Sequence, residues 1–214
     1  RGTGENAILE IVRARQEKPF THLFDFCMRV DRRVVNRRSI EALIRAGAFD
    51  AIAPNGVQGR SILLESLANA MTAAEQAIAS ANQVSLFEMP GEEEGSEPEY
   101  VQTAEWGDKK RLQEEKLALG FCISGHLFDA YADEVRKIAR VPLNKVSMSS
   151  GEKLVAGIIV SQRTNKTRSG VMYSLMIDDG TEQLELTVFE DVFENYRDCF
   201  KEDELLIAKV QTKV

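Results

Sequence analysis

The chain has 214 residues, 43% of them hydrophobic, which is enough for two small domains with buried cores. It has no apolar run of about 18 residues, which excludes a transmembrane helix, and its start lacks the basic-then-apolar pattern of a signal peptide. Cys27, Cys122 and Cys199 are odd in number and far apart. They predict reduced thiols in a cytoplasmic protein, not a disulfide framework or a zinc site.

The net charge of -7 is unevenly distributed along the chain. Residues 1–60 carry 11 basic and 7 acidic side chains, whereas residues 83–115 carry 3 basic and 10 acidic ones. Only the field near a binding site matters for a charged ligand. The basic first segment is therefore compatible with binding to nucleic acid, despite the acidic total.

Residues 1–82 have the apolar spacing of helices. Apolar side chains recur at steps of three and four residues between Ala7 and Val12, between Phe20 and Val30, and between Leu64 and Ile78. Thr21 is available as the N-cap of the second of these helices.

Two further signals mark the ends of helices in this part of the chain. Asn36 can cap a helix that carries Ile40 and Ile44, and Gly47 stands where a C-terminal glycine belongs. Pro54-Asn55-Gly56 then predicts a turn before the long last helix.

Residues 88–105 form an acidic, apolar-poor tract that cannot bury enough surface to offset its ordering entropy, so we expect a mobile linker. Helical spacing returns from Trp106 to Leu119 and again from Tyr131 to Ile138.

After Lys153 the period changes to two, with β-branched residues enriched. Strands are predicted at 154–160, 172–178, 183–190 and 205–210, with a short helix from Val192 to Phe200 between the last two. This order suits an OB barrel of five strands, of which the fifth is missing.

Two glycines precede the first helix. Gly2 and Gly4 have the spacing of a helix-hairpin-helix, in which small residues let backbone N–H groups at a helix start reach a phosphate. A plain loop before a helix is the alternative. A second, basic hairpin would lie between two helices, where arginines could contact phosphates unless they only form a solvated turn. Its candidate residues are Arg32, Arg33, Asn36, Arg37 and Arg38.

Gln83-Val84-Ser85-Leu86-Phe87 lies between the long helix and the acidic tract. Leu86 and Phe87 would each contribute about 1.5–3 kcal/mol if buried in a partner's pocket. The amide of Gln83 could donate and accept at a second pocket. The alternative is that both apolar side chains fold back onto the chain's own helices.

A basic loop is predicted between the first two strands, with an aromatic side chain beside it on the second strand. This layout is typical of single-stranded nucleic-acid binding, although an ordinary surface turn would look the same. The candidate residues are Arg163, Lys166, Thr167, Arg168 and Tyr173.

No pattern for catalysis is present. The sequence has no phosphate-binding loop of the Walker type and no zinc-ligand spacing, and His22 and His126 are isolated. Asp178-Asp179 is a carboxylate pair, but Gly180 follows it and indicates a turn. We expect no catalytic residue, metal or cofactor in this chain.

The runs at 20–27, 35–50 and 117–131, the last of which reads LALGFCISGHLFDAY, resemble the alpha subunits of bacterial DNA polymerase III. The resemblance covers the whole chain and implies a carboxy-terminal region in the order helix-hairpin-helix, clamp motif, OB domain. Leu127 departs from the family, which usually has proline after Gly-His. The catalytic aspartates, with their magnesium ions, would lie upstream in a DNA-directed DNA polymerase.

The resemblance also implies site roles. Gln83, Leu86 and Phe87 match the motif that binds the sliding clamp (the beta subunit), with Ser85 in its variable middle. Gly2 and Gly4 match the duplex-binding hairpin, whose partner would be the basic hairpin. The expected partners are duplex DNA, the clamp, single-stranded template at the OB domain and other replicase subunits, but no membrane.

We therefore expect an α+β multi-domain chain. Its predicted parts are a helix-hairpin-helix domain (1–82), the clamp motif (83–87), an acidic linker (88–105), a helical connector (106–150) and an OB-fold β-barrel truncated before its fifth strand (151–214). The expected function is processivity in DNA replication. An error-prone paralogue of the polymerase, or an RNA-binding module such as an anticodon-binding domain, is the alternative.

Overall fold

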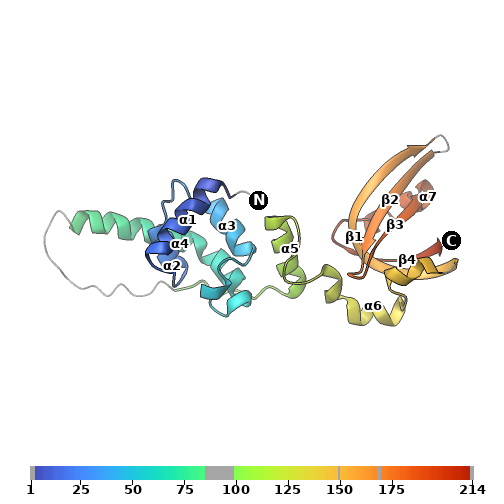
Figure 1. The fold of residues 1–214 in the computed structure, drawn as a ribbon, viewed down its shortest axis with the longest axis horizontal. Coiled ribbons are helices and arrows are strands. Elements are labelled where there is room, and N and C mark those ends of the chain that lie inside the picture. The colour runs from blue at the N-terminus through green and yellow to red at the C-terminus, as the bar shows by residue number, and fades with distance from the viewer. Residues whose placement is uncertain (1–2, 85–98, 149, 168–169, 213–214) are drawn as a thin grey trace. The chain divides into compact units, whose positions relative to one another are not determined.

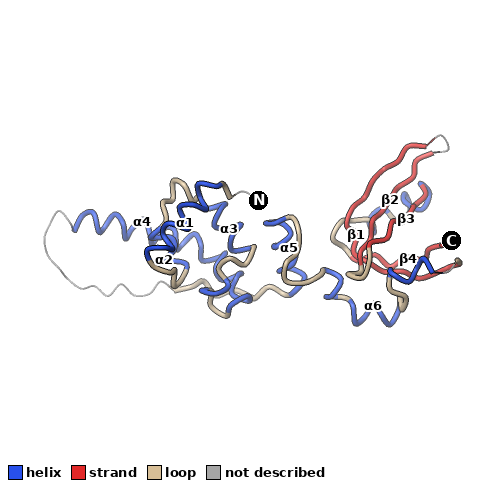
Figure 2. The backbone as a smooth tube through the Cα atoms, viewed as in Figure 1, coloured by secondary structure: helices blue, strands red, loops and turns tan. Residues whose placement is uncertain are grey.

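The computed structural model describes residues 3–84, 99–148, 150–167 and 170–212. The chain forms two compact units, Arg1–Phe121 and Cys122–Val214. The first consists of helices and the second contains the sheet (Figures 1 and 2). The α+β fold predicted from the sequence is confirmed.

The first unit contains five α-helices and two short 3-10 turns among its described residues. These are α1 (Glu5–Glu17), α2 (Leu23–Arg29), α3 (Arg37–Arg45), η1 (Asp50–Ile52), η2 (Gly56–Gly59), α4 (Arg60–Val84) and α5 (Asp108–Leu119).

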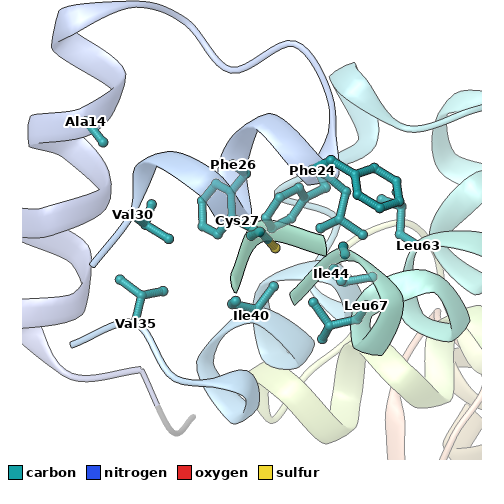
Figure 3. Close-up of a cluster of buried hydrophobic side chains, with 14 of the residues drawn as sticks. Ala14, Phe24, Phe26, Cys27, Val30, Val35, Ile40, Ile44, Leu63 and Leu67 are labelled. Carbon is teal, nitrogen blue, oxygen red and sulfur yellow. The ribbon is translucent and has the colours of Figure 1, made fainter. Parts of the chain in front are cut away.

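The core of the first unit lies between α2, α3 and α4 (Figure 3). Leu23 and Cys27 of α2, Ile40 and Ile44 of α3, and Leu67 of α4 are fully buried. Burial of the Cys27 thiol raises its pKa to about 12, so this cysteine is an inert core residue. All three cysteines are free.

The predicted helical faces are right in their centres and wrong at two ends. Ala7 and Ala14 of α1 are buried, but Ile8 is 42% exposed. In α4 the buried stripe reaches Ala74, while Ile78 is 45% exposed because the last turns of this long helix extend past the core. Spacing alone does not show where a helix leaves its neighbours.

The caps decide where α2 and α3 begin. Asn36 caps α3 as predicted, since its Oδ1 accepts the Ser39 N–H at 3.0 Å. The predicted cap of α2 is wrong: His22 Nδ1 accepts the Asp25 N–H at 3.1 Å. Thr21 lies one residue earlier and instead donates its N–H to the Asp25 carboxylate at 3.0 Å.

The residues that precede α5 pack against α2 and α4 of the first unit. The Tyr100 ring lies edge-on to Phe24 at 5.5 Å, and the Val101 N–H donates to Ser66 Oγ at 2.8 Å. Residues 99–101, expected within the linker, therefore contact α2 and α4, because an aromatic side chain follows the acidic run. Residues 88–98 lie outside the described part of the chain.

A buried ion-pair cluster holds α5 to this unit. Arg60 donates to both oxygens of Asp50 at 2.6 and 2.7 Å and to Glu115 at 2.8 Å. The Arg60 and Glu115 side chains are only 5% and 1% exposed. On the neighbouring turn, Arg45 donates to Glu114 at 2.7 Å. The segment expected as a connector, 106–150, is thus divided: α5 belongs to the first unit, and residues from Cys122 onward belong to the second.

The second unit starts with short helices and continues as a sheet. Its described elements are η3 (Leu127–Ala130), α6 (Ala132–Ile138), η4 (Leu143–Met148), β1 (Gly151–Thr167), β2 (Gly170–Asp178), β3 (Gln183–Phe189), α7 (Glu190–Asn195), η5 (Arg197–Cys199) and β4 (Leu205–Thr212).

The sheet is antiparallel, and its described strands lie in the order β3-β2-β1-β4. β1 is much longer than predicted because it pairs with two strands in turn. Its first half pairs with β4 up to Ile158–Leu205, and its second half pairs with β2 from Ile158–Asp178 onward. The register shifts between Ile159 and Ser161, which is a β-bulge and bends the strand between its two partners.

The predicted order of four strands, with a helix between the third and fourth, is confirmed. That helix is shorter than predicted: Phe193 of α7 is buried and stacks on Phe200 at 5.3 Å, but Val192 and Tyr196 are exposed. The inner face of the sheet forms the core of this unit, with Ile159 and Ile177 fully buried. The unit is therefore an OB-like arrangement.

Candidate nucleic-acid interface

The start of α1 is exposed. Gly4 is the N-cap with φ -79°, a conformation open to any residue, and its carbonyl accepts the Ala7 N–H at 3.1 Å. A Cβ atom at Gly4 would meet nothing within 4 Å, and no side chain caps the helix. The amides of Glu5 and Asn6 are therefore accessible to a phosphate, although the Glu5 carboxylate opposes an anion. Gly2 lies outside the described residues.

The predicted basic hairpin exists as a tight turn between α2 and α3. The N–H groups of Val34 and Val35 donate to the Asp31 carbonyl at 3.0 and 2.8 Å. The Asp31 carboxylate accepts from the backbone and side chain of Arg33, and these hydrogen bonds hold its pKa below the usual range. The turn is therefore held by its own hydrogen bonds and does not need a ligand to form.

The four arginines of this hairpin differ in their exposure and in their partners. Arg32 donates to the Met71 carbonyl and the Glu75 carboxylate and is only 18% exposed, so it anchors the turn to α4. Arg33 is 90% exposed, and Arg37 is 58% exposed beside Glu41. Arg38 is exposed and forms no ion pair with any described residue.

Asn36 and these arginines therefore have different roles in the hairpin. The Asn36 side chain is occupied as the cap of α3, so it positions the hairpin. Around the N-terminus of that helix, Arg33 and Arg37 are exposed but paired with Asp31 and Glu41, and Arg38 is exposed without an ion pair among the described residues. Arg32 was predicted to contact a phosphate because its neighbours in sequence are basic. Its contact with α4 gives it a structural role that the sequence did not indicate.

The predicted clamp motif begins where α4 ends. Gln83 lies in the last turn of α4, whereas Ser85, Leu86 and Phe87 lie outside the described residues. The described chain on both sides belongs to the first unit, through α4 before the motif and through Tyr100 after it. Both interpretations of Leu86 and Phe87 therefore stay predictions.

The basic residues of the OB-like unit are in a different setting from the one predicted. Arg163 and Lys166 lie on β1 and not in a loop, because the ladder with β2 continues as far as Thr167–Gly170. Arg168 lies outside the described residues. Tyr173 is stacked on Phe193 with ring centroids 3.5 Å apart, so that face of its ring is already covered.

Strand pairing places Arg163 and Tyr173 on opposite faces. Arg163 pairs with Ser174, the neighbour of Tyr173, and side chains alternate along a strand. The exposed aromatic on the Arg163 face is Phe189, which pairs with Met172 and is 60% exposed. The sequence did carry the signal for Phe189: if Leu184, Leu186 and Val188 point inward, the next residue points outward.

Both histidines cap short helices, as their isolation indicated. His126 Nδ1 accepts the Phe128 N–H at 3.1 Å, and Asp129 accepts the His126 N–H at 2.9 Å. This capped turn replaces the proline that the resemblance led us to expect at Leu127. Asp178 accepts the Gly180 N–H at 2.7 Å, which confirms the predicted turn.

The described residues contain no group of three or more metal-ligating side chains. They also contain no helix with the length and apolarity needed to cross a bilayer.

Comparison with known proteins identifies one of the predicted parts. Residues 1–58 match the helix-hairpin-helix motif family. The chain is 41% identical over 216 residues to the DNA polymerase III subunit alpha of Neisseria meningitidis serogroup A. It is 33% identical over 219 residues to that of Escherichia coli K12, and 32% identical over 220 residues to that of Vibrio cholerae.

These alignments cover 99–100% of this chain but 18% of each relative, so the chain spans less than a fifth of the length of the curated relatives it matches. The identity extends from the helical unit through the sheet. Over its whole length, the chain is therefore similar to one part of the bacterial DNA polymerase III alpha subunits.

Proposed function

We propose that this chain is the DNA- and sliding-clamp-binding region of a replicative polymerase and supplies its processivity. The observation that carries the proposal is the helix-hairpin-helix match over residues 1–58, together with exposed arginines at the N-terminus of α3. The whole protein would be a cytoplasmic DNA-directed DNA polymerase, and its magnesium-dependent chemistry would lie elsewhere in that protein.

The hairpin residues suit duplex DNA of any sequence. Guanidinium groups and helix N-termini contact phosphates, which position a protein without reading bases. Arg33, Arg37 and Arg38 are exposed at one helix start, and the amides of α1 are open beyond Gly4.

Reversing two of these charges should weaken duplex binding. In Arg37→Glu with Arg38→Glu, affinity should fall equally for all sequences, and the slope of log affinity against log salt should drop by roughly two, because two phosphate contacts are lost. Acidic side chains are favourable at a helix N-terminus, so α3 should still fold. Fluorescence anisotropy over a salt series measures both quantities.

The matched control is Arg15→Glu with Lys18→Glu, which makes the same charge change at the other end of α1, where both side chains are exposed. It should leave the slope unchanged. Equal losses for the two pairs would show that only the overall charge matters, and duplex binding that ignores salt would refute the hairpin assignment.

The clamp motif would act as an exposed peptide. Gln83 would fix its register by amide hydrogen bonds, and Leu86 and Phe87 would be the apolar anchors, the kind of side chain that dominates binding energy. A short peptide of this type reaches a Kd of about a micromolar. Joined to duplex binding in one chain, two weak contacts can raise avidity by about 10²–10⁴.

Removing both anchors should nearly abolish clamp binding. Leu86→Ala with Phe87→Ala loses about 1.5–3 kcal/mol for each side chain, and therefore about two to four decades in Kd. Met89→Ala is the control, because it removes a large apolar side chain just after the motif. Calorimetric titration of the clamp with each variant measures the effect.

Unchanged affinity in the double variant would reject the motif. If the double variant instead melts at a lower temperature than the Met89→Ala control, Leu86 and Phe87 belong to the chain's own core.

For single-stranded template, the proposed binding surface is the outer face of the sheet. Phe189 and Arg163 share that face, and base stacking on an exposed aromatic beside a cation is typical of OB folds. Lys166, Arg168 and Tyr173, predicted earlier for this role, remain in the proposal only as flanking residues. Other replicase subunits are further expected partners.

A further inference from the structure

The second unit contains a cavity of about 360 Å³ that none of the roles above uses. It is bounded by η3, by the end of α6 with the residues that follow it, by β1 and by the turn between β2 and β3. Its apolar lining includes Phe128, Ala139, Pro142 and Ala156. This volume is at the lower end of the range for small-molecule sites, which are about 300–1,000 Å³.

Two arginines supply the charge of this cavity. Arg136 lies on α6 and Arg140 follows four residues later, and both line the cavity. Both side chains are exposed, and neither forms an ion pair or hydrogen bond with any residue in the described ranges. Their guanidinium groups can therefore turn to a ligand without breaking an internal contact.

The one carboxylate in the lining is already occupied. Asp179 accepts the Leu143 N–H at 2.9 Å, the Thr181 N–H at 2.9 Å and the Thr181 hydroxyl at 2.6 Å. Burial raises the pKa of Asp179, but these hydrogen bonds outweigh it and leave the pKa below the usual range, so the group stays ionised. Asp179 thus holds η4 to the β2–β3 turn, and the lining keeps one excess positive charge.

We propose that this cavity binds a nucleoside phosphate. The two guanidinium forks would take the phosphate oxygens, for which their geometry is suited, and the apolar lining would take the base or sugar. The proposal rests on the proposed function, because a DNA polymerase region meets nucleotides both free and within a single strand. Either source presents the same phosphate and base.

The test is a titration of the 214-residue chain with thymidine 5′-monophosphate, followed by NMR shifts of the residues around the cavity. One site with a Kd of about a millimolar is expected, and thymidine without phosphate should bind about tenfold more weakly. Arg136→Gln with Arg140→Gln should raise the Kd by about tenfold or more, since two charged hydrogen-bond donors are lost.

The matched control is Lys137→Gln with Lys145→Gln, which removes the same charge from exposed positions of this region that do not line the cavity. It should leave the Kd within about twofold of the native value, because a phosphate contact needs a donor in place and not the general field. Val141→Glu places a carboxylate in the lining and should abolish binding.

Two further titrations identify the source. Tighter binding of oligothymidylate, lost in the arginine double variant, indicates a strand, and tighter binding of thymidine triphosphate indicates a free nucleotide. Equal losses in the arginine and lysine pairs, no shift at the cavity, or binding of an acidic peptide in place of the monophosphate would each overturn the proposal. Duplex binding measured in parallel separates its failure from failure of the proposed function.

Discussion

Replacing Glu115 with alanine is expected to destabilise the helical unit by about 3–5 kcal/mol, because it breaks a buried ion pair from one side. The Arg60 guanidinium is 5% exposed and would lose the partner to which it donates at 2.8 Å. Asp50 would remain, but its two hydrogen bonds use other N–H groups of Arg60. Arg60 Nη1 would then have only the Arg45 carbonyl, at 3.3 Å, as an acceptor for its two N–H bonds.

Urea unfolding followed by circular dichroism measures this cost, and Glu114→Ala is the matched control. Glu114 is the adjacent carboxylate, paired with Arg45 and with Lys110, whose side chains are 22% and 56% exposed. Solvent can replace those contacts, so the loss should be about 1 kcal/mol. Equal losses for the two variants would show that Arg60 and Glu115 do not form a buried pair.

Gly59→Ala is expected to cost about 3 kcal/mol, the upper end for a side chain forced into filled space. Gly59 is buried at the end of η2, and a Cβ there would overlap the Pro54 carbonyl oxygen and lie 2.8 Å from its carbon. Those are backbone atoms of a tight turn that can move only by opening it. Calorimetric melting of the chain measures the change.

The control is Gly56→Ala in the same turn. Gly56 has φ +60°, but its Cβ would meet only the Asp50 carbonyl, at 3.9 Å. Its cost should be that of a left-handed alanine alone, about 1 kcal/mol. A larger loss at Gly56 than at Gly59 would mean that backbone conformation, and not the close approach to Pro54, limits this turn.

The elements of this protein follow from local patterns in its sequence. Asn36 marks the start of α3 and Gly47, at φ +83°, follows its end, because both depend on the backbone within a few residues. The strands β2 and β3 follow from alternation, which depends on each residue and its neighbours alone. The family resemblance then gave the order of the parts, and the comparisons confirm that relationship.

The roles of the charged and aromatic side chains depended on contacts between distant parts of the chain. Arg32 looks like a phosphate ligand until α4 brings Glu75 to it from 43 positions away. Tyr173 looks like a base-stacking residue until α7 covers its ring with Phe193, which leaves Phe189 as the exposed aromatic on the described strands. A guanidinium or a ring binds whichever partner the fold brings nearest, and local sequence carries no information about that partner.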